Sequence, residues 1–531
     1  MALEQSVTID VLPPELLVQI FGLLDGPAPS DARFHDQPEI DMLKTSKTPL
    51  KDISLVSKRW RAIVLPVLFR NVVWTLDRWE LPLAAPGEAA DPVEAIPILA
   101  FLRANDLGRY VASFTMLVSN KMQPATRRAE SRPALGLLSG SSMEMRAPWA
   151  DLRLDMLARS SQYPTSNSAA AYNEDNNWVW DMLFGLMDPL RFSIIASPQM
   201  LASLLSCMLF LGDADSFSHR NLLHILSLSR DAKSRGTRAG PSPRDKPPAR
   251  SAPGPAPAAS HACSSCGRDR VRTRSTLFAI RPWTHLLLNE GSSIRVYRNY
   301  EFFLRRPPSI LGALLGCEEA PNDTPLVPPT VHSLSYIAIF PLSSHFGTLV
   351  SALPRVDRLF VQLVPRNDVL LDPEEMRNVQ ASDLWMERNS CYGLVLRQLL
   401  SGGSFGSDDD DDDDDDGDDG GDEGADSDQE ADHDRLQHNW RYLREFESGD
   451  AADKEAWEMA VHYLGMSQTG WRVEREGVFV KGPKPGRRQT PGGGEDGSSD
   501  GGSADEGGDG NDDPDTGLET LSVSPESFSP W

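Results

Sequence analysis

The sequence predicts an α/β protein with a short N-terminal helical module, a body that mixes helices with strands, and long disordered insertions. Three observations lead to this prediction. Apolar residues in the first 76 positions recur every three or four residues, which is the period of amphipathic helices. Further along, short apolar runs predict strands between helical segments. Stretches rich in proline, glycine or aspartate interrupt this pattern and predict disorder.

The first predicted helix begins at Pro13 and Pro14 and stops before Gly26. Proline suits the first turn of a helix, because the N–H that it lacks would have no partner there. Glu15 adds a negative charge at the positive end of the helix dipole. The apolar residues of this segment form one broad face, made of Leu16, Leu17, Ile20, Phe21, Leu23 and Leu24. Gly26 followed by Pro27 is typical of a helix end.

A second helical segment is predicted from Pro49, with Thr48 before it as a candidate cap. The same spacing relates its apolar residues, which are Leu50, Ile53, Val56 and Trp60. The polar residues 26–49 between the two segments are expected to loop out. A module of about fifty residues is too small to bury all of these apolar faces, so some of them should face a partner.

The string Leu-Pro-Pro-Glu-Leu-Leu-Val-Gln-Ile-Phe at 12–21, followed by Leu-Val-Ser-Lys-Arg-Trp at 55–60, resembles an F-box. The resemblance implies a three-helix module over residues 8–76 that binds a Skp-family adaptor and, through it, a cullin-type ubiquitin ligase. The insertion at 26–49 is longer than the connection usual in this family. By periodicity alone, the same segments could instead be the core hairpin of an ordinary helical domain.

Carried over residue by residue, the resemblance implies an adaptor-binding surface on the first and later helices of the module. Its residues would be Leu12, Pro13, Leu16, Leu17, Ile20, Leu24, Val56 and Trp60. Asp25 and Ser57 also match the pattern of the family.

Charge is distributed unevenly along the chain. The net charge is −25, but residues 401–531 hold 37 acidic and 10 basic residues, whereas residues 1–400 hold 40 and 42. The acidity therefore belongs to the C-terminal part, and the rest of the chain is nearly neutral.

The cysteine content predicts a reducing compartment, because five cysteines in 531 residues do not make a disulfide framework. The first residues lack a basic stretch before an apolar one, so we expect no secretory leader. The longest apolar run, at 200–211, is too short to cross a membrane. These features predict a cytoplasmic or nuclear protein that does not bind membranes.

The first part of the body, residues 93–230, is expected to be mostly helical with a few short strands, one of them at 111–118, and with polar surface loops at 121–176. Its buried helices are expected at 178–190, 198–211 and 221–229. Residues 231–275 are rich in proline and alanine and read as a disordered linker. The basic run at its end is typical of a solvated linker, with nuclear import or nucleic-acid contact as the alternative.

Residues 276–400 contain three predicted strands, at 276–280, 331–339 and 356–364, and a predicted helix at 345–353. Leu334-x-Tyr336 aligns with Leu359-x-Val361 at a spacing of 25 residues, inside the range of leucine-rich repeats. The stretch resembles the degenerate leucine-rich repeats of fungal F-box proteins. This implies a horseshoe-shaped solenoid, with an irregular α/β or helical domain as the alternative.

The C-terminal part of the chain is predicted to contain one ordered segment between two disordered ones. Residues 401–433 contain nine consecutive aspartates, Asp408–Asp416, whose mutual repulsion predicts a disordered loop, with a binding role toward cations or histones as the alternative. Residues 434–480 show two helical faces and a strand pair at 471–480, which we expect to cap the end of the body. Residues 481–531 read as a disordered tail.

No catalytic constellation is visible. The sequence lacks a Gly-x-Ser-x-Gly elbow, a phosphate-binding loop and a His-Glu-x-x-His motif. Cys263 and Cys266, with His261 beside them, supply only half of a zinc site and lie in the linker. We therefore expect no catalytic residue, metal or cofactor.

One group of arginines is a candidate substrate-binding patch, because arginine suits bidentate recognition of carboxylate or phosphate. Its members are Arg281, Arg295, Arg298, Arg305 and Arg306, with Trp283, Tyr297 and Tyr300 among them. The alternative is that these arginines are scattered over helix surfaces.

The sequence thus predicts the substrate receptor of an SCF-type ubiquitin ligase, which holds an unknown target protein and itself does no covalent chemistry. Two alternatives stay open. The protein could be an F-box scaffold outside the ligase, or a module whose acidic segment binds basic proteins. No specific nucleic-acid partner is expected.

Overall fold

The structure is a computed structural model. It describes residues 9–28, 33–44, 49–76, 92–118, 177–210, 213–217, 222–234, 275–319, 322–365, 368–401, 438–450, 454–467 and 469–482. The chain divides into one unit that ends at Gly482 and a second from Pro483 onward, and the description concerns the first. The aspartate run, the C-terminal tail, most of the predicted linker and the Cys263–Cys266 pair lie outside the described residues.

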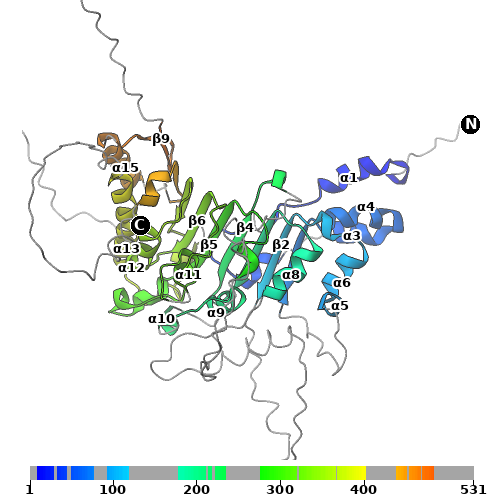
Figure 1. Ribbon diagram of the computed structural model, residues 1–531, viewed down its shortest axis with the longest axis horizontal. Helices are drawn as coiled ribbons and strands as arrows, with labels where there is room; N and C mark the ends of the chain where they lie inside the picture. Colours follow the sequence, from blue (N-terminus) through cyan, green and yellow to red (C-terminus); the bar gives the residue numbers. More distant parts are fainter. Residues whose placement is uncertain are drawn as a thin grey trace, which may run out of the picture. The chain divides into compact units, whose positions relative to one another are not determined.

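The described strands form one mixed sheet, and they lie in it almost in chain order (Figure 1). The order is β1-β2-β3-β4-β5-β6-β7-β8-β10-β9. Neighbouring strands are parallel except where β4 and β10 run opposite to their neighbours. The bounds are β1 Asn71–Thr75, β2 Ser113–Val118, β3 Arg191–Ala196, β4 His224–Ser229, β5 His285–Ser292, β6 Ser333–Ile339, β7 Arg358–Gln362, β8 Glu445–Ser448, β9 Trp471–Arg475 and β10 Val478–Lys481.

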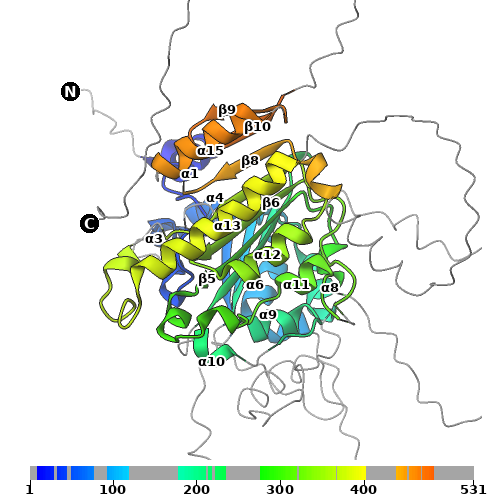
Figure 2. The same ribbon diagram turned by 90° about the vertical axis from the view of Figure 1, so that its left-hand side faces the viewer.

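The helices lie at one end of the sheet and over one of its faces (Figures 1 and 2). Their bounds are α1 Pro14–Gly22, α3 Pro49–Val56, α4 Lys58–Leu68, α5 Pro92–Ala95, α6 Pro97–Ala104, α8 Asn177–Leu186, α9 Pro198–Leu204, α10 Ala214–Phe217, α11 Leu311–Leu315, α12 Ser343–Ser351, α13 Ala381–Ser401 and α15 Lys454–Met466. Short 3₁₀ segments are η1 Ile9–Val11, η2 Ile40–Leu43, η4 Gly108–Tyr110, η7 Ala232–Ser234, η9 Thr276–Phe278, η10 Ile294–Arg298, η11 Phe302–Leu304, η12 Asp368–Leu371 and η13 His438–Tyr442.

The main core lies between the sheet and the helices that cover it. Side chains alternate across a strand, so every second residue of the sheet enters this core. In β2, Phe114 and Met116 are buried there, whereas Ser113 and Thr115 lie on the opposite face. The ring of Phe114 stacks on Phe192 of β3 at 5.9 Å. The helix-covered face is therefore apolar and the opposite face is largely polar.

The insertion between α1 and α3 does not loop out, which corrects the expectation for residues 26–49. Its residues 33–44 lie on the polar face of the sheet, where Phe34 and Met42 are buried with Leu117, Ile195 and Ile225. Asn289 of β5 donates hydrogen bonds to the carbonyls of Phe34 and Asp36, both at 2.8 Å. Gln362 of β7 donates to the carbonyl of His35 at 3.0 Å.

Several predicted elements are confirmed. The strand at 111–118 is β2, the helix at 345–353 is α12, and the pair at 471–480 is β9 and β10. The alignment of Leu334 with Leu359 is the register in which β6 and β7 pair.

Two predicted elements are wrong. A helix was expected at 221–229, but residues 224–229 form β4, because both faces of this strand are buried between β3 and β5. Residues 276–280, expected as a strand, form η9, where the Leu277 carbonyl accepts a hydrogen bond from Trp283 Nε1 at 2.9 Å.

The 25-residue spacing is not repeated along the sheet in the described residues. Paired positions are Asn71 and Ser113 in β1 and β2, and Leu286 and Leu334 in β5 and β6. These separations exceed 25 residues, and β4 reverses the strand direction. A mixed α/β architecture is therefore observed, and a leucine-rich-repeat solenoid stays a prediction.

Candidate functional site

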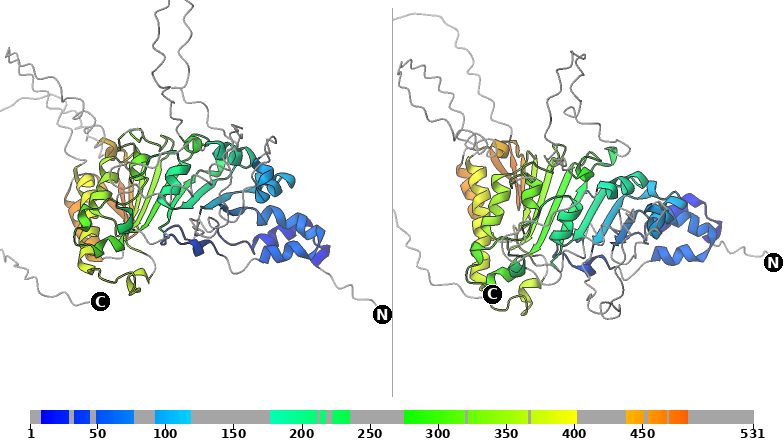
Figure 3. Two further views of the ribbon diagram at one scale, coloured as in Figure 1. Left: turned by 90° about the horizontal axis from the view of Figure 1, so that it is seen from below. Right: turned by 60° about the horizontal axis from the view of Figure 1, so that its bottom comes forward.

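The N-terminal helices α1, α3 and α4 form a small module at one end of the sheet (Figure 3). Its core consists of Leu17, Phe21, Leu50 and Val64. Trp60 packs against Phe21 with ring centroids 5.3 Å apart. The apolar spacing from Leu50 to Trp60 continues across Ser57, but Ser57 is extended and begins a new helix by accepting a hydrogen bond from the N–H of Trp60. The second predicted segment is therefore two helices.

Helix α1 and the two residues that follow it carry a second apolar stripe that faces away from this core. Leu16 is 44% exposed, Ile20 37%, Leu23 86% and Leu24 45%. On α3, Leu55 is 76% and Val56 62% exposed. We call these six residues the exposed apolar face of the module. Large apolar groups exposed together on a surface mark interaction sites more often than isolated ones do.

The structure places the predicted adaptor-binding residues in three environments. Pro13, Leu16, Ile20, Leu24 and Val56 are exposed, and Leu12 and Trp60 are half-buried against the core of the module. Leu17 has no exposed surface. The side chain of Leu17 therefore holds the module together and offers no surface to a partner in this structure.

The sequence prediction did not include Leu23 and Leu55, although they are the most exposed residues of the exposed apolar face. Val11, at the start of the module, is also strongly exposed. The signal was present in the sequence: Leu23 lies seven residues after Leu16 and therefore on the same side of the helix.

The candidate arginine patch is not brought together as an open surface. Arg281 pairs with Asp188 at 2.6 Å, and Arg295 pairs with Glu375 at 2.5 Å. Arg298 donates to the backbone carbonyls of residues 374 and 375. The other two pairs are Arg305 with Asp213 at 3.1 Å and Arg306 with Glu318 at 2.5 Å.

These contacts give the arginines structural partners inside the chain. Trp283 and Tyr297, which lie among them in the sequence, are buried in two different clusters, and only Tyr300 of the three aromatic residues is exposed. The side chains proposed for substrate recognition therefore join body segments in this structure.

A buried polar network joins β5, β6 and α12. Glu290 accepts hydrogen bonds from Tyr336 OH at 2.5 Å and from Ser309 Oγ, and His345 Nε2 lies 2.9 Å from the same carboxylate. Burial alone would raise the pKa of Glu290, but His345, His224 and Ser309 outweigh this effect and lower it to about 2. Nearby His224 is fully buried, and burial lowers its pKa to about 4.

This network cannot act as a serine–histidine nucleophile pair, because the carboxylate of Glu290 lies between Ser309 and His345 and binds both. Glu290 is 8% exposed and Tyr336 has no exposed surface. The network is therefore a set of satisfied buried polar groups that fix β5, β6 and α12.

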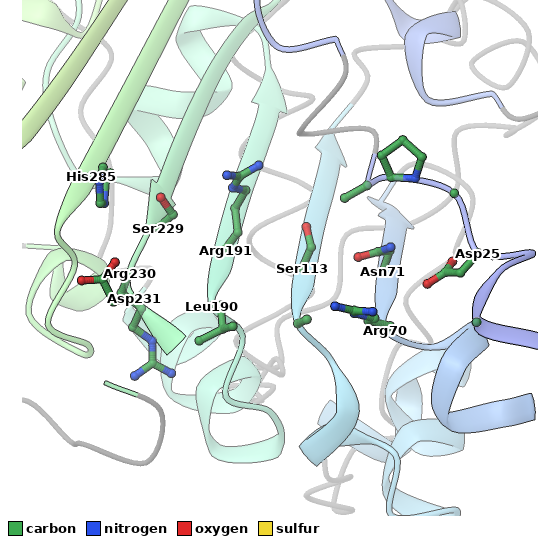
Figure 4. Close-up of a pocket in the computed structure, with 15 residues that line it drawn as sticks. Asp25, Arg70, Asn71, Ser113, Leu190, Arg191, Ser229, Arg230, Asp231 and His285 are labelled. Atoms are coloured by element: carbon green, nitrogen blue, oxygen red, sulfur yellow. The ribbon is translucent and has the colours of Figure 1, made fainter. Parts of the chain in front are cut away.

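A pocket of about 610 Å³ lies where the end of α1 meets the polar face of the sheet (Figure 4). Asp25 and Arg70 line one side, and Asp231 and His285 line the other, with Arg191 between them. Burial raises the pKa of Asp25, against the effect of Arg70, and burial lowers the pKa of Arg191.

The pocket is part of a continuous polar row across the sheet. The paired residues of this row are Asn71, Ser113, Arg191, Ser229, His285, Ser333, Arg358 and Glu445. This surface carries positive and negative side chains and several hydroxyl groups, so it can form hydrogen bonds with a polar peptide. It does not favour ligands of one sign of charge.

In the part of the chain that the structure describes, no three His, Cys, Asp or Glu side chains gather closely enough to hold a metal ion. No described helix is both long enough and apolar enough to cross a membrane.

Comparison with known proteins gives one match. The F-box-like family model matches residues 9–73, which are the helical module and its connection into β1. No curated protein and no solved structure matches the chain. The N-terminal module is therefore an F-box-like domain, and domains of this kind generally bind Skp-type adaptors.

Proposed function

We propose that this protein is a substrate receptor of an SCF-type cullin ubiquitin ligase. The F-box-like domain binds a Skp-family adaptor through its exposed apolar face, and the adaptor connects it to a cullin. The α/β body holds a target protein, and other subunits transfer ubiquitin. The chain performs no covalent step itself, and it works in the cytoplasm or the nucleus.

The observation that carries this proposal is the second apolar stripe of α1. Helix α1 buries Leu17 and Phe21 in the module and still presents Leu16, Ile20 and Leu23 to solvent. Burying a large apolar side chain fully is worth about 1.5–3 kcal/mol. Covering the exposed parts of the six residues would give on the order of 5–10 kcal/mol before the costs of association.

The attachment of the domain to the body supports a receptor that presents its target in a defined direction. Helix α4 runs directly into β1, and residues 33–44 bind β5 and β7 through Asn289 and Gln362. An adaptor bound to α1 and a target bound to the body would therefore be held at a fixed separation.

The test is reconstitution with the full chain. A Skp-family adaptor co-expressed with it should elute with it as one complex in size-exclusion chromatography, and adding a cullin should shift that complex further. An adaptor that elutes separately at micromolar concentrations would contradict the proposal.

The second candidate is an F-box scaffold that binds the adaptor outside the ligase. The two functions differ in the lifetime of the bound partner. A ligase receptor predicts that a body-bound protein is degraded more slowly when this chain is removed, whereas a scaffold predicts an unchanged lifetime.

A module that binds basic proteins through its acidic segment is the remaining alternative. Its test is the deletion of Asp408–Asp416, which lie outside the described residues. Loss of all partner binding in that deletion would favour this alternative over the receptor.

A further inference from the structure

Two arginines lie against one tyrosine near the edge of the sheet opposite the F-box-like domain. The guanidinium carbon of Arg355 is 4.0 Å from the ring centroid of Tyr442, and that of Arg441 is 4.9 Å away. Arg441 also donates a hydrogen bond to the hydroxyl of Tyr442 at 2.9 Å. We call these three residues the arginine–tyrosine cluster. Both arginine side chains are exposed, and the tyrosine is half-buried.

The backbone under the cluster is held firmly in place. Arg441 and Tyr442 end η13, which packs on the end of α12 through the buried Trp440. Trp440 Nε1 donates to the carbonyl of Val350 at 2.8 Å, and Asn439 Nδ2 donates to the carbonyl of Leu353 at 2.9 Å. Carbonyls at a helix C-terminus need such partners. The geometry of the cluster is therefore fixed by its surroundings before any ligand arrives.

The charge around the cluster is predominantly positive. Arg444 is exposed beside it, and Lys481 Nζ lies 3.5 Å from the carbonyl of Arg441. The nearby carboxylate of Asp357 lies 3.8 Å from both Arg444 and His332. Among the described residues, no carboxylate lies within 4.0 Å of Arg355 or Arg441.

This situation differs from that of the arginines of the predicted patch. Arg281, Arg295 and Arg306 each have a carboxylate of this chain as partner. Arg109 offers the best comparison, because it lies 4.8 Å from the ring of the adjacent Tyr110 in η4 but also pairs with Asp106 at 3.3 Å. A stacked arginine without such a carboxylate keeps its N–H groups for an external acceptor.

We propose that the arginine–tyrosine cluster binds an acidic segment of a partner protein through its carboxylate or phosphate oxygens. Stacking on Tyr442 orients the two guanidinium planes, and each plane can donate two parallel hydrogen bonds to one oxyanion. Arg444, which itself lies 3.8 Å from the Asp357 carboxylate, is not needed for this contact. That the bound segment is a ligase substrate rests on the proposed function, whereas the binding itself does not.

The chain's own sequence supplies a possible competitor, which the experiment must remove. Residues 402–437 contain 18 acidic residues against one arginine, and the chain continues from them into η13, three residues before Arg441. A tethered anionic segment has a high effective concentration near its point of attachment. Binding is therefore measured on the full chain and on the same chain without Asp408–Asp416.

The assay is fluorescence anisotropy with three labelled peptides of twelve residues. One alternates glutamate with glycine, one replaces the glutamates with phosphoserines, and one replaces them with glutamines. The test variant is R355Q/R441Q and the matched control is R109Q. Because all three positions are exposed, circular dichroism should be unchanged in each variant.

The proposal expects both anionic peptides to bind and the glutamine peptide not to bind. R355Q/R441Q should weaken binding about tenfold or more, R109Q should leave it unchanged, and rising salt should weaken it steadily. The ratio of the two anionic affinities identifies phosphate or carboxylate as the preferred oxyanion. Binding that appears only after deletion of the aspartate run, and is lost with R355Q/R441Q, supports the site and identifies the run as its competitor.

Three results would overturn the proposal. They are no binding of either anionic peptide to the deletion variant at low salt, equal binding by R355Q/R441Q, and an equal loss in R109Q. If a single-stranded oligonucleotide bound the same arginines more tightly than both peptides, the ligand of the cluster would be a nucleic acid and not a protein segment. Adaptor binding by R355Q/R441Q, measured in parallel, should be normal, so failure of this site and failure of the proposed function give different results.

Discussion

Replacing Leu16 and Ile20 by aspartate should strongly weaken adaptor binding in the molecules whose F-box-like domain is folded. The two side chains are 44% and 37% exposed, so covering each exposed part contributes about 0.6–1.3 kcal/mol. The double variant loses about 2 kcal/mol of this burial and places two carboxylates against an apolar contact, which costs at least about 2 kcal/mol more. A total near 4 kcal/mol corresponds to roughly thousandfold weaker binding.

The cost to folding comes from the parts of Leu16 and Ile20 that are already covered, which are more than half of each side chain and contribute about 2–4 kcal/mol together. Aspartate is a poorer helix former than leucine by about 0.5 kcal/mol at an exposed site, and near the start of a helix its charge is favourable. Isothermal titration with a purified Skp-family adaptor measures the affinity, and circular dichroism checks the fold. Leu371→Asp, which changes a more exposed leucine in η12 of the body (78% exposed), is the control for the added charge and should bind normally. A folded L16D/I20D variant with wild-type affinity would refute the assignment of this face.

Three further predictions concern stability. Leu17→Ala should destabilise the F-box-like domain by about 2–5 kcal/mol, because it leaves a cavity in the core, and urea unfolding followed by tryptophan fluorescence measures the loss. Asn289→Ala removes both hydrogen bonds to residues 33–44 and should raise amide hydrogen exchange there by about tenfold or more, with exchange in α13 unchanged. Because the pKa of His224 falls from 6.5 to about 4 on folding, stability should be greatest above pH 6.5 and fall by about 3 kcal/mol between pH 6.5 and 4. His224→Asn should flatten this pH dependence, and an unchanged slope would contradict the assignment.

The sequence identifies the F-box-like domain because its signal is local. The proline start, the acidic first turn and the apolar spacing of α1 lie within eleven residues, and Ser57 marks the start of α4 by its capping side chain. The register of β6 and β7 was also predictable, because a short connection with one helix joins these two strands.

The remaining elements depend on contacts between distant segments. Residues 222–228 fit both a helical and an alternating pattern, and only their place between β3 and β5 makes them a strand. The apolar residues of the segment at 33–44 are few and irregularly spaced, and nothing near them in the sequence indicates that strands β2 to β4 cover Phe34 and Met42. For β4 and for residues 33–44, burial is therefore decided by distant residues, and both were predicted wrongly.

The same limit applies to the candidate sites. The sequence lists arginines but does not show which carboxylate each one meets, so Arg281 and Arg295 were candidates until the structure paired them with Asp188 and Glu375. Arg355 and Arg441 are separated by 86 positions and became neighbours only through the packing of η13 on α12. Exposed arginine pairs of this kind cannot be found without the fold.

The packing of residues 33–44 on the sheet also determines where the chain can be divided into separate fragments. A fragment that ends at residue 76 would carry Phe34 and Met42 without the strands that cover them, and the remaining fragment would expose Leu117, Ile195 and Ile225. Both pieces would then present new apolar surface and tend to aggregate. The sequence motif ends near residue 73, but the smallest autonomous folding unit extends through the sheet, so engineered fusions should join the chain outside it.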